Sequence, residues 1–481
     1  MRVNQLSKQM QQFEQYKQVY FIGIGGIGMS ALARYFNQNG LTVGGYDKTP
    51  SPLTKQLDEE GCMIHFDDLG DQLPEQFRNK ENTLVIYTPA IKQLGELTFF
   101  KSGGFILLKR AEVLGMLTRQ SKGLCVAGTH GKTTTSSMLA FMLDQSDMKC
   151  NAFLGGIATN FQSNLVLNKD SVFTVIEADE FDRSFLHLSP FASIITSADP
   201  DHLDIYGTAE QFKEGFRQFA MKLDPKGICL QKEGLNLPSL GTTLTYAVES
   251  ESADYTVVNL QWMDGFLCGD IRLKNSWWRT VQFGLPGIHN AENALACVGL
   301  LHELGMDEKQ IRSGLKNFLG VKRRFEYIIR TDRLVYVDDY AHHPQEIAAL
   351  VRSIKLLYPG KQITGIFQPH LFSRTKDFAD DFATELSELD ELILLPIYPA
   401  REEPMQGITS EWLLSKCKNG QKTIKKPSEL LPYLSQYTDG VLLTIGAGDI
   451  DRLVPSLSHA FQLQVQARAR NNLVRRMLLI A

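Results

Sequence analysis

The sequence predicts an α/β protein with three domains: an N-terminal Rossmann-like domain, a central domain with a mostly parallel sheet, and a C-terminal Rossmann-like domain. Three observations favour this class. The 481 residues are too many for one hydrophobic core and suit about three domains of roughly 150 residues each. Short apolar runs alternate along the chain with stretches of helical period. Glycine-rich or polar clusters follow several of these runs, where a parallel sheet binds its ligands.

The first predicted domain spans residues 1–117 and opens with a glycine turn. An apolar strand at 18–22 runs into Gly-Ile-Gly-Gly-Ile-Gly at 23–28, and a helical pattern follows over 29–39. The next strand, 41–46, ends at an aspartate about 20 residues beyond the glycines, as in dinucleotide-binding folds. The candidate binding residues here are Gly25, Gly26, Gly28 and Asp47.

Taken alone, this turn is typical of a nicotinamide dehydrogenase. The glycines indicate only that a nucleotide diphosphate can bind at a helix N-terminus, so the identity of the nucleotide stays open. Two further strands are expected at 84–87 and 105–108 and complete the domain.

The second predicted domain, 118–324, carries the strongest signal. The apolar run 123–127 leads into Gly-Thr-His-Gly-Lys-Thr-Thr, and a helical pattern continues over 135–143. Glycines allow backbone N–H groups to approach phosphate oxygens, and the helix N-terminus attracts negative charge. The loop has two residues between its first glycine and Gly-Lys where the standard phosphate loop has four, so it is a shortened relative. The candidate ATP-binding residues are Gly128, Thr129, His130, Gly131, Lys132, Thr133 and Thr134.

Within this loop two side chains have predicted roles. Lys132 would lie along the β- and γ-phosphates, and the Thr133 hydroxyl would ligate Mg²⁺. We expect Lys132 to act on the transferring charge and not to support the core.

Acidic residues follow two later apolar runs. The run 172–176 precedes Glu177, Asp179 and Glu180, and the run 192–196 precedes a polar cluster at 199–204 that contains His202. Carboxyl ends of parallel strands share one edge of the sheet, so both clusters should face the phosphate loop. As isolated residues they would be solvated loop acids and a capping or core histidine. Beside a phosphate loop they become candidates for binding Mg²⁺, which prefers oxygen ligands.

The third predicted domain, 325–481, repeats the pattern of strands followed by polar clusters. Expected strands lie at 333–337, 362–367, 391–395 and 440–445. The clusters that follow them, at 338–344, 368–375 and 446–449, indicate a second doubly wound sheet with ligands at its carboxyl edge. We assign no role to the basic tail at 468–476.

Composition excludes several classes. A net charge of −4 gives no basic excess for nucleic acid as the main partner, and no run approaches the roughly 18 apolar residues of a membrane helix. Seven scattered cysteines without a Cys-x-x-Cys pair indicate reduced thiols rather than disulfides or structural zinc. The first 17 residues are polar and glutamine-rich, unlike a signal peptide. We therefore expect a cytoplasmic protein without membrane insertion.

Five segments together resemble the Mur ligase family, in order across almost the whole chain: 128–134, 177–180, 201–202, 287–293 and 323–325. The resemblance implies a first domain that binds UDP rather than NAD, a central ATPase domain, and a third domain that closes over the site. Segments 23–30, 338–344 and 367–370 resemble the members that act on UDP-N-acetylmuramate and L-alanine.

The reaction that this resemblance implies is ATP-dependent amide formation in peptidoglycan precursor synthesis. The lactyl carboxylate of UDP-N-acetylmuramate attacks the γ-phosphate of ATP, and the L-alanine amine then displaces phosphate from the acyl phosphate. Two anions must meet in the first step, so Lys132 and Mg²⁺ would offset their repulsion.

The resemblance also implies roles for individual residues. Thr133 and Glu177 resemble ligands of one Mg²⁺, and Glu177 and His202 ligands of a second. The implied adenosine and phosphate contacts are Asn290, Asn293, Arg324 and Asp339. The implied amino-acid site is Tyr340, His342 and Arg374, and the implied catalytic residues are Lys132, His202 and Arg374. Asn290 and Asn293 are alternatively helix caps.

Two positions depart from the family pattern. Leu371 stands where many relatives carry an arginine, so recognition of the amino-acid carboxylate would rest more heavily on Arg374. Phe181 stands where a serine often follows the acidic segment.

Other functions stay open at this point. A sister ligase would add another amino acid or a preformed peptide to the same sugar nucleotide. A nucleotide-binding regulator would need the phosphate loop but no second metal site. We expect a monomer or a weak homodimer.

Overall fold

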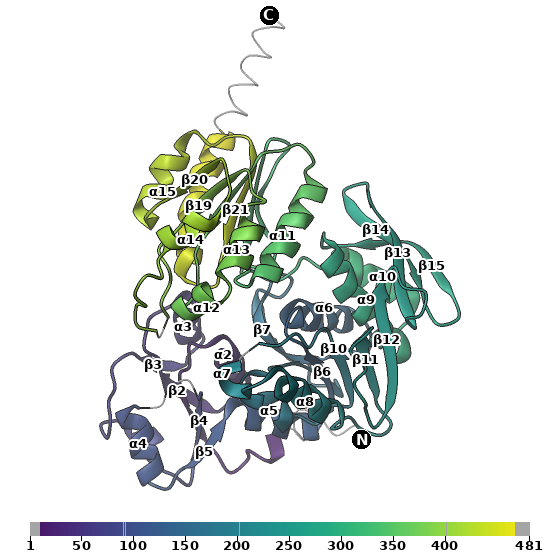
Figure 1. Ribbon diagram of the computed structural model, residues 1–481. Coiled ribbons are helices and arrows are strands. Elements are labelled where there is room, and N and C mark those ends of the chain that lie inside the picture. Colours follow the sequence, from purple (N-terminus) through teal and green to yellow (C-terminus); the bar gives the residue numbers. More distant parts are fainter. Residues whose placement is uncertain (1–9, 90, 92, 202, 401, 467–481) are drawn as a thin grey trace, which may run out of the picture. The chain divides into compact units, whose positions relative to one another are not determined.

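The computed structural model describes residues 10–89, 91, 93–201, 203–400 and 402–466, and Figure 1 shows its elements. Three sheets with predominantly parallel strands carry helices between the strands, which confirms the predicted α/β class. The chain divides into two compact units, Met1–Gly320 and Val321–Ala481. The first unit holds two of the sheets and the second unit holds one.

The first sheet has five parallel strands in the order β3-β2-β1-β4-β5, which is the Rossmann order without its sixth strand. Its strands are β1 (Gln18–Ile22), β2 (Thr42–Tyr46), β3 (Met63–His65), β4 (Thr83–Tyr87) and β5 (Ile106–Lys109). Its helices are α2 (Ile27–Gln38), α3 (Pro52–Glu59), α4 (Gly95–Ser102) and α5 (Arg110–Arg119), with the short 3₁₀ helix η1 (Glu75–Phe77). The four predicted strands are present to within a residue, and β3 was not predicted.

The second sheet has ten strands in the order β15-β14-β13-β12-β11-β10-β6-β9-β7-β8. Its centre is parallel, and β7–β8 and β13–β15 add antiparallel hairpins at the two ends. The strands are β6 (Lys122–Ala127), β7 (Asn151–Ala158), β8 (Ser163–Val166), β9 (Phe173–Ala178), β10 (Ala192–Ile195), β11 (Ile228–Lys232), β12 (Thr242–Val248), β13 (Tyr255–Met263), β14 (Phe266–Arg272) and β15 (Trp277–Phe283). The helices are α6 (Lys132–Asp144), η2 (Phe181–His187), α7 (Leu203–Tyr206), α8 (Ala209–Ala220), α9 (Ile288–Glu303) and α10 (Glu308–Asn317).

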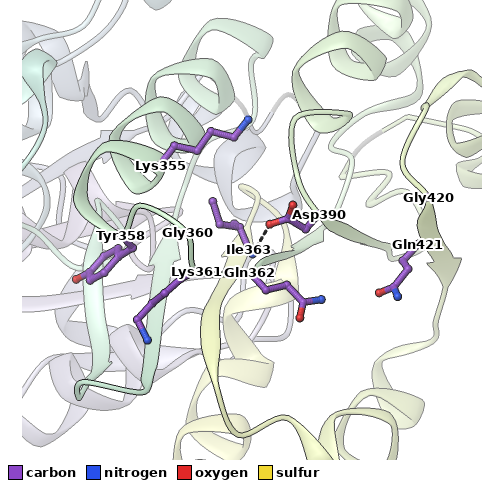
Figure 2. Close-up of a pocket in the computed structure, with 9 residues that line it drawn as sticks. All are labelled: Lys355, Tyr358, Gly360, Lys361, Gln362, Ile363, Asp390, Gly420 and Gln421. Carbon is purple, nitrogen blue, oxygen red and sulfur yellow. Dashed lines mark hydrogen bonds between the residues drawn. The ribbon is translucent and has the colours of Figure 1, made fainter.

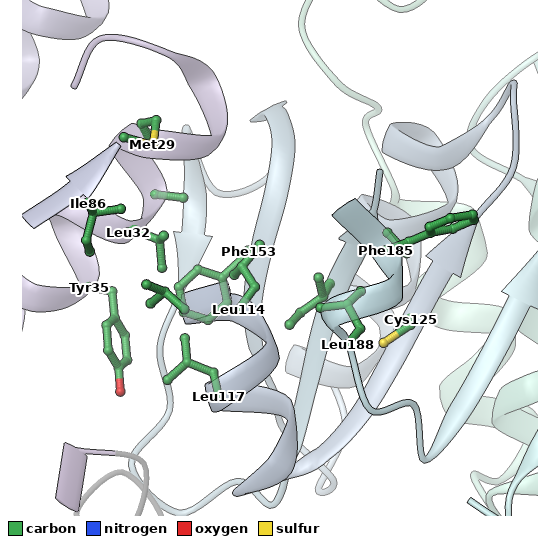
Figure 3. Close-up of a cluster of buried hydrophobic side chains, with 14 of the residues drawn as sticks. Met29, Leu32, Tyr35, Ile86, Leu114, Leu117, Cys125, Phe153, Phe185 and Leu188 are labelled. Carbon is green, nitrogen blue, oxygen red and sulfur yellow. The ribbon is translucent and has the colours of Figure 1, made fainter. Parts of the chain in front are cut away.

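One hydrophobic core joins these two sheets into a single unit. It contains Leu32 of α2 and Leu117 of α5 from the first block, and Phe153 of β7 and Phe185 of η2 from the second. Figure 3 shows the leucines of α5 among side chains of both blocks. Helix α2 is buried over eight consecutive residues because it packs against the first sheet and also against β7 and β8.

A buried polar network fixes the same contact between α2 and the second sheet. The Asn164 side-chain amide of β8 donates to Ile27 O at 2.6 Å and to Ser30 Oγ at 2.9 Å, and Arg34 Nη1 donates to Asn164 Oδ1 at 2.5 Å. Buried polar groups impose a specific geometry because each must keep its partners. The glycine turn that starts α2 is thereby held at a fixed place relative to the second sheet.

The second unit contains one sheet, in the order β16-β17-β21-β18-β19-β20, parallel except for β16. Its strands are β16 (Glu326–Arg330), β17 (Leu334–Asp339), β18 (Ile363–Phe367), β19 (Glu391–Leu394), β20 (Gln421–Ile424) and β21 (Gly440–Ile445). Its helices are α11 (Pro344–Leu357), α12 (Phe372–Asp377), α13 (Ala379–Leu386), α14 (Ser410–Lys416), α15 (Pro427–Tyr433), η3 (Leu434–Gln436) and η4 (Asp449–Leu453).

The structure bears on two of the exclusions made from composition. All seven cysteines are buried free thiols, as the sequence predicted. In the part of the chain that the structure describes, no helix combines the length and apolarity that a bilayer crossing requires.

Candidate active site

The phosphate loop lies between β6 and α6, as predicted. Gly128 and Gly131 have φ of 143° and 79°, values that favour glycine. A Cβ on Gly128 would lie 2.0 Å from Thr196 Oγ1, and one on Gly131 would lie 2.7 Å from Asn293 Oδ1. Glycine is therefore required at both positions, and Asn293 lies directly beside the loop.

The segment after β10 accepts hydrogen bonds from the phosphate loop. Thr129 Oγ1 donates to Asp199 O at 2.7 Å, and the His130 N–H donates to Ser197 Oγ at 2.9 Å. Thr134 is buried with Thr133 in the first turn of α6. These contacts shape the loop without using the backbone N–H groups that open α6.

Lys132 extends back over its own loop. Its Nζ donates to Gly128 O at 2.6 Å and Thr129 O at 3.3 Å, and lies 2.7 Å from Glu180 Oε2. Burial by itself lowers the pKa of Lys132, but the negative charges of Glu180 and Asp179 raise it above its ordinary value, so Lys132 stays protonated. The side chain of Glu180 is only 3% exposed.

This ion pair corrects the expectation that Lys132 does not support the core. A buried carboxylate without a counter-charge is strongly destabilising, so Lys132 stabilises the fold as well as the site. Glu180 was seen in the sequence as one of three acids after a strand, but nothing in the spacing identified it as the partner of Lys132.

Thr133 and Glu177 form an oxygen pair next to Lys132. Thr133 Oγ1 donates to Glu177 Oε1 at 3.0 Å, and the Gly155 N–H donates to Oε2 at 3.1 Å. Two adjacent ligands of an octahedral Mg²⁺ lie about 2.9 Å apart when each metal–oxygen distance is about 2.05 Å. The chemistry and spacing of this pair therefore fit one magnesium ion.

The second predicted metal ligand cannot be placed. His202 lies outside the described residues. Among the residues that are described, no three histidine, cysteine or acidic side chains gather in a metal-binding cluster.

The two asparagines of α9 are buried but neither occupies the N-cap, which is Gly287 with a φ of 97°. The Asn290 side chain donates to Pro286 O at 2.7 Å and so holds the turn before the helix. Asn293 is the one directed to the phosphate loop, through its contact with Gly131.

The glycine turn of the first sheet contacts an acid and a base. The Gly25 N–H donates to Asp47 Oδ2 at 2.7 Å, and Gly26 is the N-cap of α2. Gly28 packs against the guanidinium of Arg110, whose Nη1 would lie 1.8 Å from a Cβ at that position. The sequence analysis did not identify Arg110 as a site residue. Its position, as a basic residue directly after a parallel strand, is the signal that could have identified it.

In the second unit, two aspartates end β17. Asp339 accepts hydrogen bonds from the N–H groups of Phe325 at 2.7 Å and Ala341 at 2.8 Å. Burial raises the pKa of Asp339 to about 6, although Arg324 opposes the shift. Burial likewise raises the pKa of Asp338 to about 7, and its Oδ1 accepts from Thr444 Oγ1 at 2.5 Å.

Two arginines flank Tyr340. The guanidinium carbons of Arg323 and Arg324 lie 5.0 and 4.9 Å from the centre of its ring, within the range of cation–π attraction. Arg323 also donates to Gly446 O at 2.6 Å and lies 3.5 Å from Asp338. The sequence predicted a role for Arg324 and Tyr340 but not for Arg323.

The predicted amino-acid residues lie near one another. His342 Nδ1 lies 3.0 Å from Tyr340 O and 3.2 Å from Glu346 Oε2, and its ring is 6.2 Å from that of His370. Burial lowers the pKa of His342 and lowers that of His370 to about 4, and the charge of Arg374 contributes to both shifts. Both imidazoles are therefore neutral beside the cationic Arg374.

The backbone at Leu371 explains how α12 starts. Leu371 has a φ of 71°, uncommon for a residue with a branched side chain, and it is the N-cap of the helix that carries Arg374. Its carbonyl accepts from Thr375 Oγ1 at 2.7 Å.

A separate pocket of about 660 Å³ occurs in the second unit (Figure 2). It lies at the amino ends of β18, β19 and β20, next to Ile363, Asp390 and Gln421. Asp339 is the last residue of β17 and Arg374 lies beyond the carboxyl end of β18, so this pocket is at the opposite edge of the sheet from them.

Comparison with known proteins identifies the family to which the chain belongs. Three family models match: the Mur ligase family catalytic domain over residues 18–122, the Mur ligase middle domain over 126–301, and the Mur ligase glutamate ligase domain over 323–448. The chain therefore belongs to the Mur ligase family, which confirms the resemblance seen in its motifs.

Similarity to individual proteins indicates which members of the family the chain resembles. The UDP-N-acetylmuramate–L-alanine ligase of Parabacteroides distasonis is 50% identical over 93% of this chain and 98% of its own. The crystal structure of UDP-N-acetylmuramate-alanine ligase from Thermotoga maritima has a TM-score of 0.79 and 27% identity over 94% of this chain and 99% of its own. A murein peptide ligase from Psychrobacter arcticus shares the fold, with a TM-score of 0.66 and 22% identity over 92% of this chain and 98% of its own.

The raised pKa of Asp338 gives a pH-dependent stability. Because burial holds the folded pKa near 7, above the ordinary value of 3.8, the native state binds the extra proton, and ionisation between about pH 4 and pH 7 favours unfolding. The wild-type protein should therefore lose free energy of unfolding as the pH rises through this window. Asp338→Asn cannot ionise, so the difference in free energy of unfolding, variant minus wild type, should increase with pH. Urea denaturation at pH 5, 6, 7 and 8 measures it, and parallel curves for the two proteins would contradict the assignment.

Proposed function

We propose that this chain is an ATP-dependent ligase that joins L-alanine to the lactyl carboxylate of UDP-N-acetylmuramate in peptidoglycan precursor synthesis. The single observation that carries the proposal is the 50% identity with a ligase of that name over nearly the whole length of both chains. The phosphate loop with Lys132 and the neighbouring Thr133–Glu177 pair supports the ATP-dependent step. The free thiols agree with a cytoplasmic enzyme, and we retain the expectation of a monomer or weak homodimer.

Each of the three predicted domains has its own part in substrate binding, as the sequence suggested. Residues 1–117 bind the UDP-sugar, 118–324 bind ATP, and 325–481 contribute to ATP and amino-acid binding. Within them, the UDP-sugar residues are Gly25, Gly26, Gly28 and Asp47. The ATP residues are 128–134, Asn290, Asn293, Arg324 and Asp339, and the amino-acid residues are Tyr340, His342 and Arg374.

The first chemical step brings a carboxylate to the γ-phosphate of ATP. Backbone N–H groups at the start of α6 and the protonated Lys132 neutralise charge on the transferring group. Thr133 and Glu177 would hold one Mg²⁺, and Glu177 with His202 a second. The metal, when bound, supplies positive charge that lowers the repulsion between the two anions. ADP leaves as the bond to the carboxylate oxygen forms, and the product is an acyl phosphate, whose phosphate is in turn a good leaving group.

The second step needs an unprotonated amine held in place by its carboxylate. Arg374 offers a planar guanidinium for two parallel hydrogen bonds to that carboxylate. Two neutral imidazoles, His342 and His370, lie beside it and add no competing charge. The amine attacks the acyl carbon, and phosphate leaves.

A single assay tests the function. The full-length protein is incubated with ATP, Mg²⁺ and UDP-N-acetylmuramate, and only the amino acid is varied while phosphate release is measured. We expect release with L-alanine, accompanied by the UDP-sugar amide in the mass spectrum. A faster reaction with a preformed peptide or an acidic amino acid would make the chain a sister ligase instead.

Lys132→Ala should lower turnover by about two to three orders of magnitude, as expected when a group that stabilises developing charge is removed. It should also lower the melting temperature, because Glu180 is left buried without its counter-charge. Adding Glu180→Gln to this variant should restore much of the melting temperature but not the turnover. Recovery of turnover in the double variant would show that Lys132 acts only through the fold.

Arg374→Lys should raise the KM for L-alanine at least about tenfold, because lysine cannot make the two-pronged contact that a charge-assisted pair needs. The KM values for ATP and the UDP-sugar should change little. Steady-state kinetics with each substrate varied in turn measures this. An effect on ATP with alanine unchanged would remove Arg374 from the amino-acid site.

A further inference from the structure

A salt bridge in the first unit connects the glycine turn with the acidic segment beside the phosphate loop. Arg110 is the first residue of α5, and its Nη2 donates to Asp179 Oδ2 at 3.0 Å. Asp179 follows β9 and precedes Glu180, the partner of Lys132. One guanidinium therefore lies between the start of α2 and the residues that hold Lys132.

The packing of Arg110 on the turn is unusually close. A Cβ on Gly28 would lie 1.8 Å from Nη1, 2.9 Å from Cζ and 3.1 Å from Cδ of Arg110. A side chain at position 28 would displace the guanidinium from this place, so glycine at 28 leaves room for the arginine. Helix α2 has no acidic residue in its first turn and no side-chain cap, so a guanidinium and the positive end of a helix dipole lie together.

We propose that Arg110 is a substrate-binding residue that exchanges partners: it pairs with Asp179 in the free enzyme and with the diphosphate of the UDP-sugar in the complex. The identity of this anion rests on the proposed function. Release of Asp179 from Arg110 changes the charge next to Glu180 and Lys132, so occupation of the first nucleotide site is communicated to the second.

The strength of the two contacts favours the exchange. The side chains of Arg110 and Asp179 are 26% and 35% exposed, and ion pairs open to water contribute little to stability. Guanidinium makes stronger, two-pronged hydrogen bonds to phosphate oxygens. A diphosphate at the turn therefore competes successfully with one aspartate.

The test is a double-mutant cycle on the full-length protein, with the Kd of UDP-N-acetylmuramate measured by titration calorimetry in the absence of ATP. Arg110→Ala should raise this Kd at least about tenfold. Asp179→Asn should lower it about threefold, because the competing carboxylate is gone. In the Arg110→Ala background the same aspartate substitution should change the Kd by less than about twofold.

The chain offers a matched control in the neighbouring ion pair. Lys109 Nζ lies 3.0 Å from Asp182 Oδ2 and connects the same two segments, but Gly28 contacts Arg110 rather than Lys109. Lys109→Ala should leave the Kd within about twofold of wild type, at a comparable cost in melting temperature.

Each possible result of these titrations points to a different interpretation of the Arg110–Asp179 pair. Folded Arg110→Ala with a wild-type Kd, or weaker binding by Asp179→Asn, would overturn the exchange and make the pair structural. Equal tightening by Asp179→Asn in both backgrounds would show direct repulsion of the ligand instead. Wild-type protein that does not bind UDP-N-acetylmuramate would overturn the proposed function together with this inference, whereas the other results overturn the inference alone.

Discussion

The parallel pairing of β6 with its two neighbours is the constraint on which the phosphate site depends. In this register Ala127, the last residue of β6, lies opposite Ala178 of β9 and Ile195 of β10. The three segments that leave these strands must therefore start at one edge of the sheet. The phosphate loop, the acids at 177–180 and the segment that binds Thr129 and His130 are neighbours for this reason.

Charge at this edge is held in place by the backbone. Glu177 accepts from the Gly155 N–H, and Lys132 donates to two carbonyls of its own loop. Such contacts fix a side chain before any ligand arrives, so that less ordering is required on binding. The buried Lys132–Glu180 pair adds a requirement for both charges, since either one alone would be strongly unfavourable.

The shared core of the first unit gives the glycine turn its place. Leu117 and Phe185 belong to one cluster although they lie in different predicted domains, and Asn164 ties β8 to α2. A turn that would otherwise belong to an independent Rossmann domain is thus fixed against the phosphate-binding sheet. The Arg110–Asp179 pair spans this same junction.

The sequence by itself determined the elements whose signal is local. The strands at 18–22 and 440–445 were predicted with their observed limits, because each is a mostly apolar run that a glycine follows. The phosphate loop was recognisable because Gly131 and Lys132 are adjacent in the chain. By contrast β7, with a glycine pair in its middle, β14, with a glycine and an aspartate in its interior, and β15, with exposed polar residues, lack a continuous run and were missed.

Only the tertiary structure decided which charges meet. Glu180 was one of three equivalent acids until the sheet brought it to Lys132, 48 residues away in the chain. Arg110 contacts Gly28 although their numbers differ by 82. Arg323 donates a hydrogen bond to Gly446 O, which is also distant in the sequence. Motif spacing reports neighbours within a strand, turn or helix, whereas these contacts depend on strand order and on burial, which arise only when the whole sheet and its core have formed.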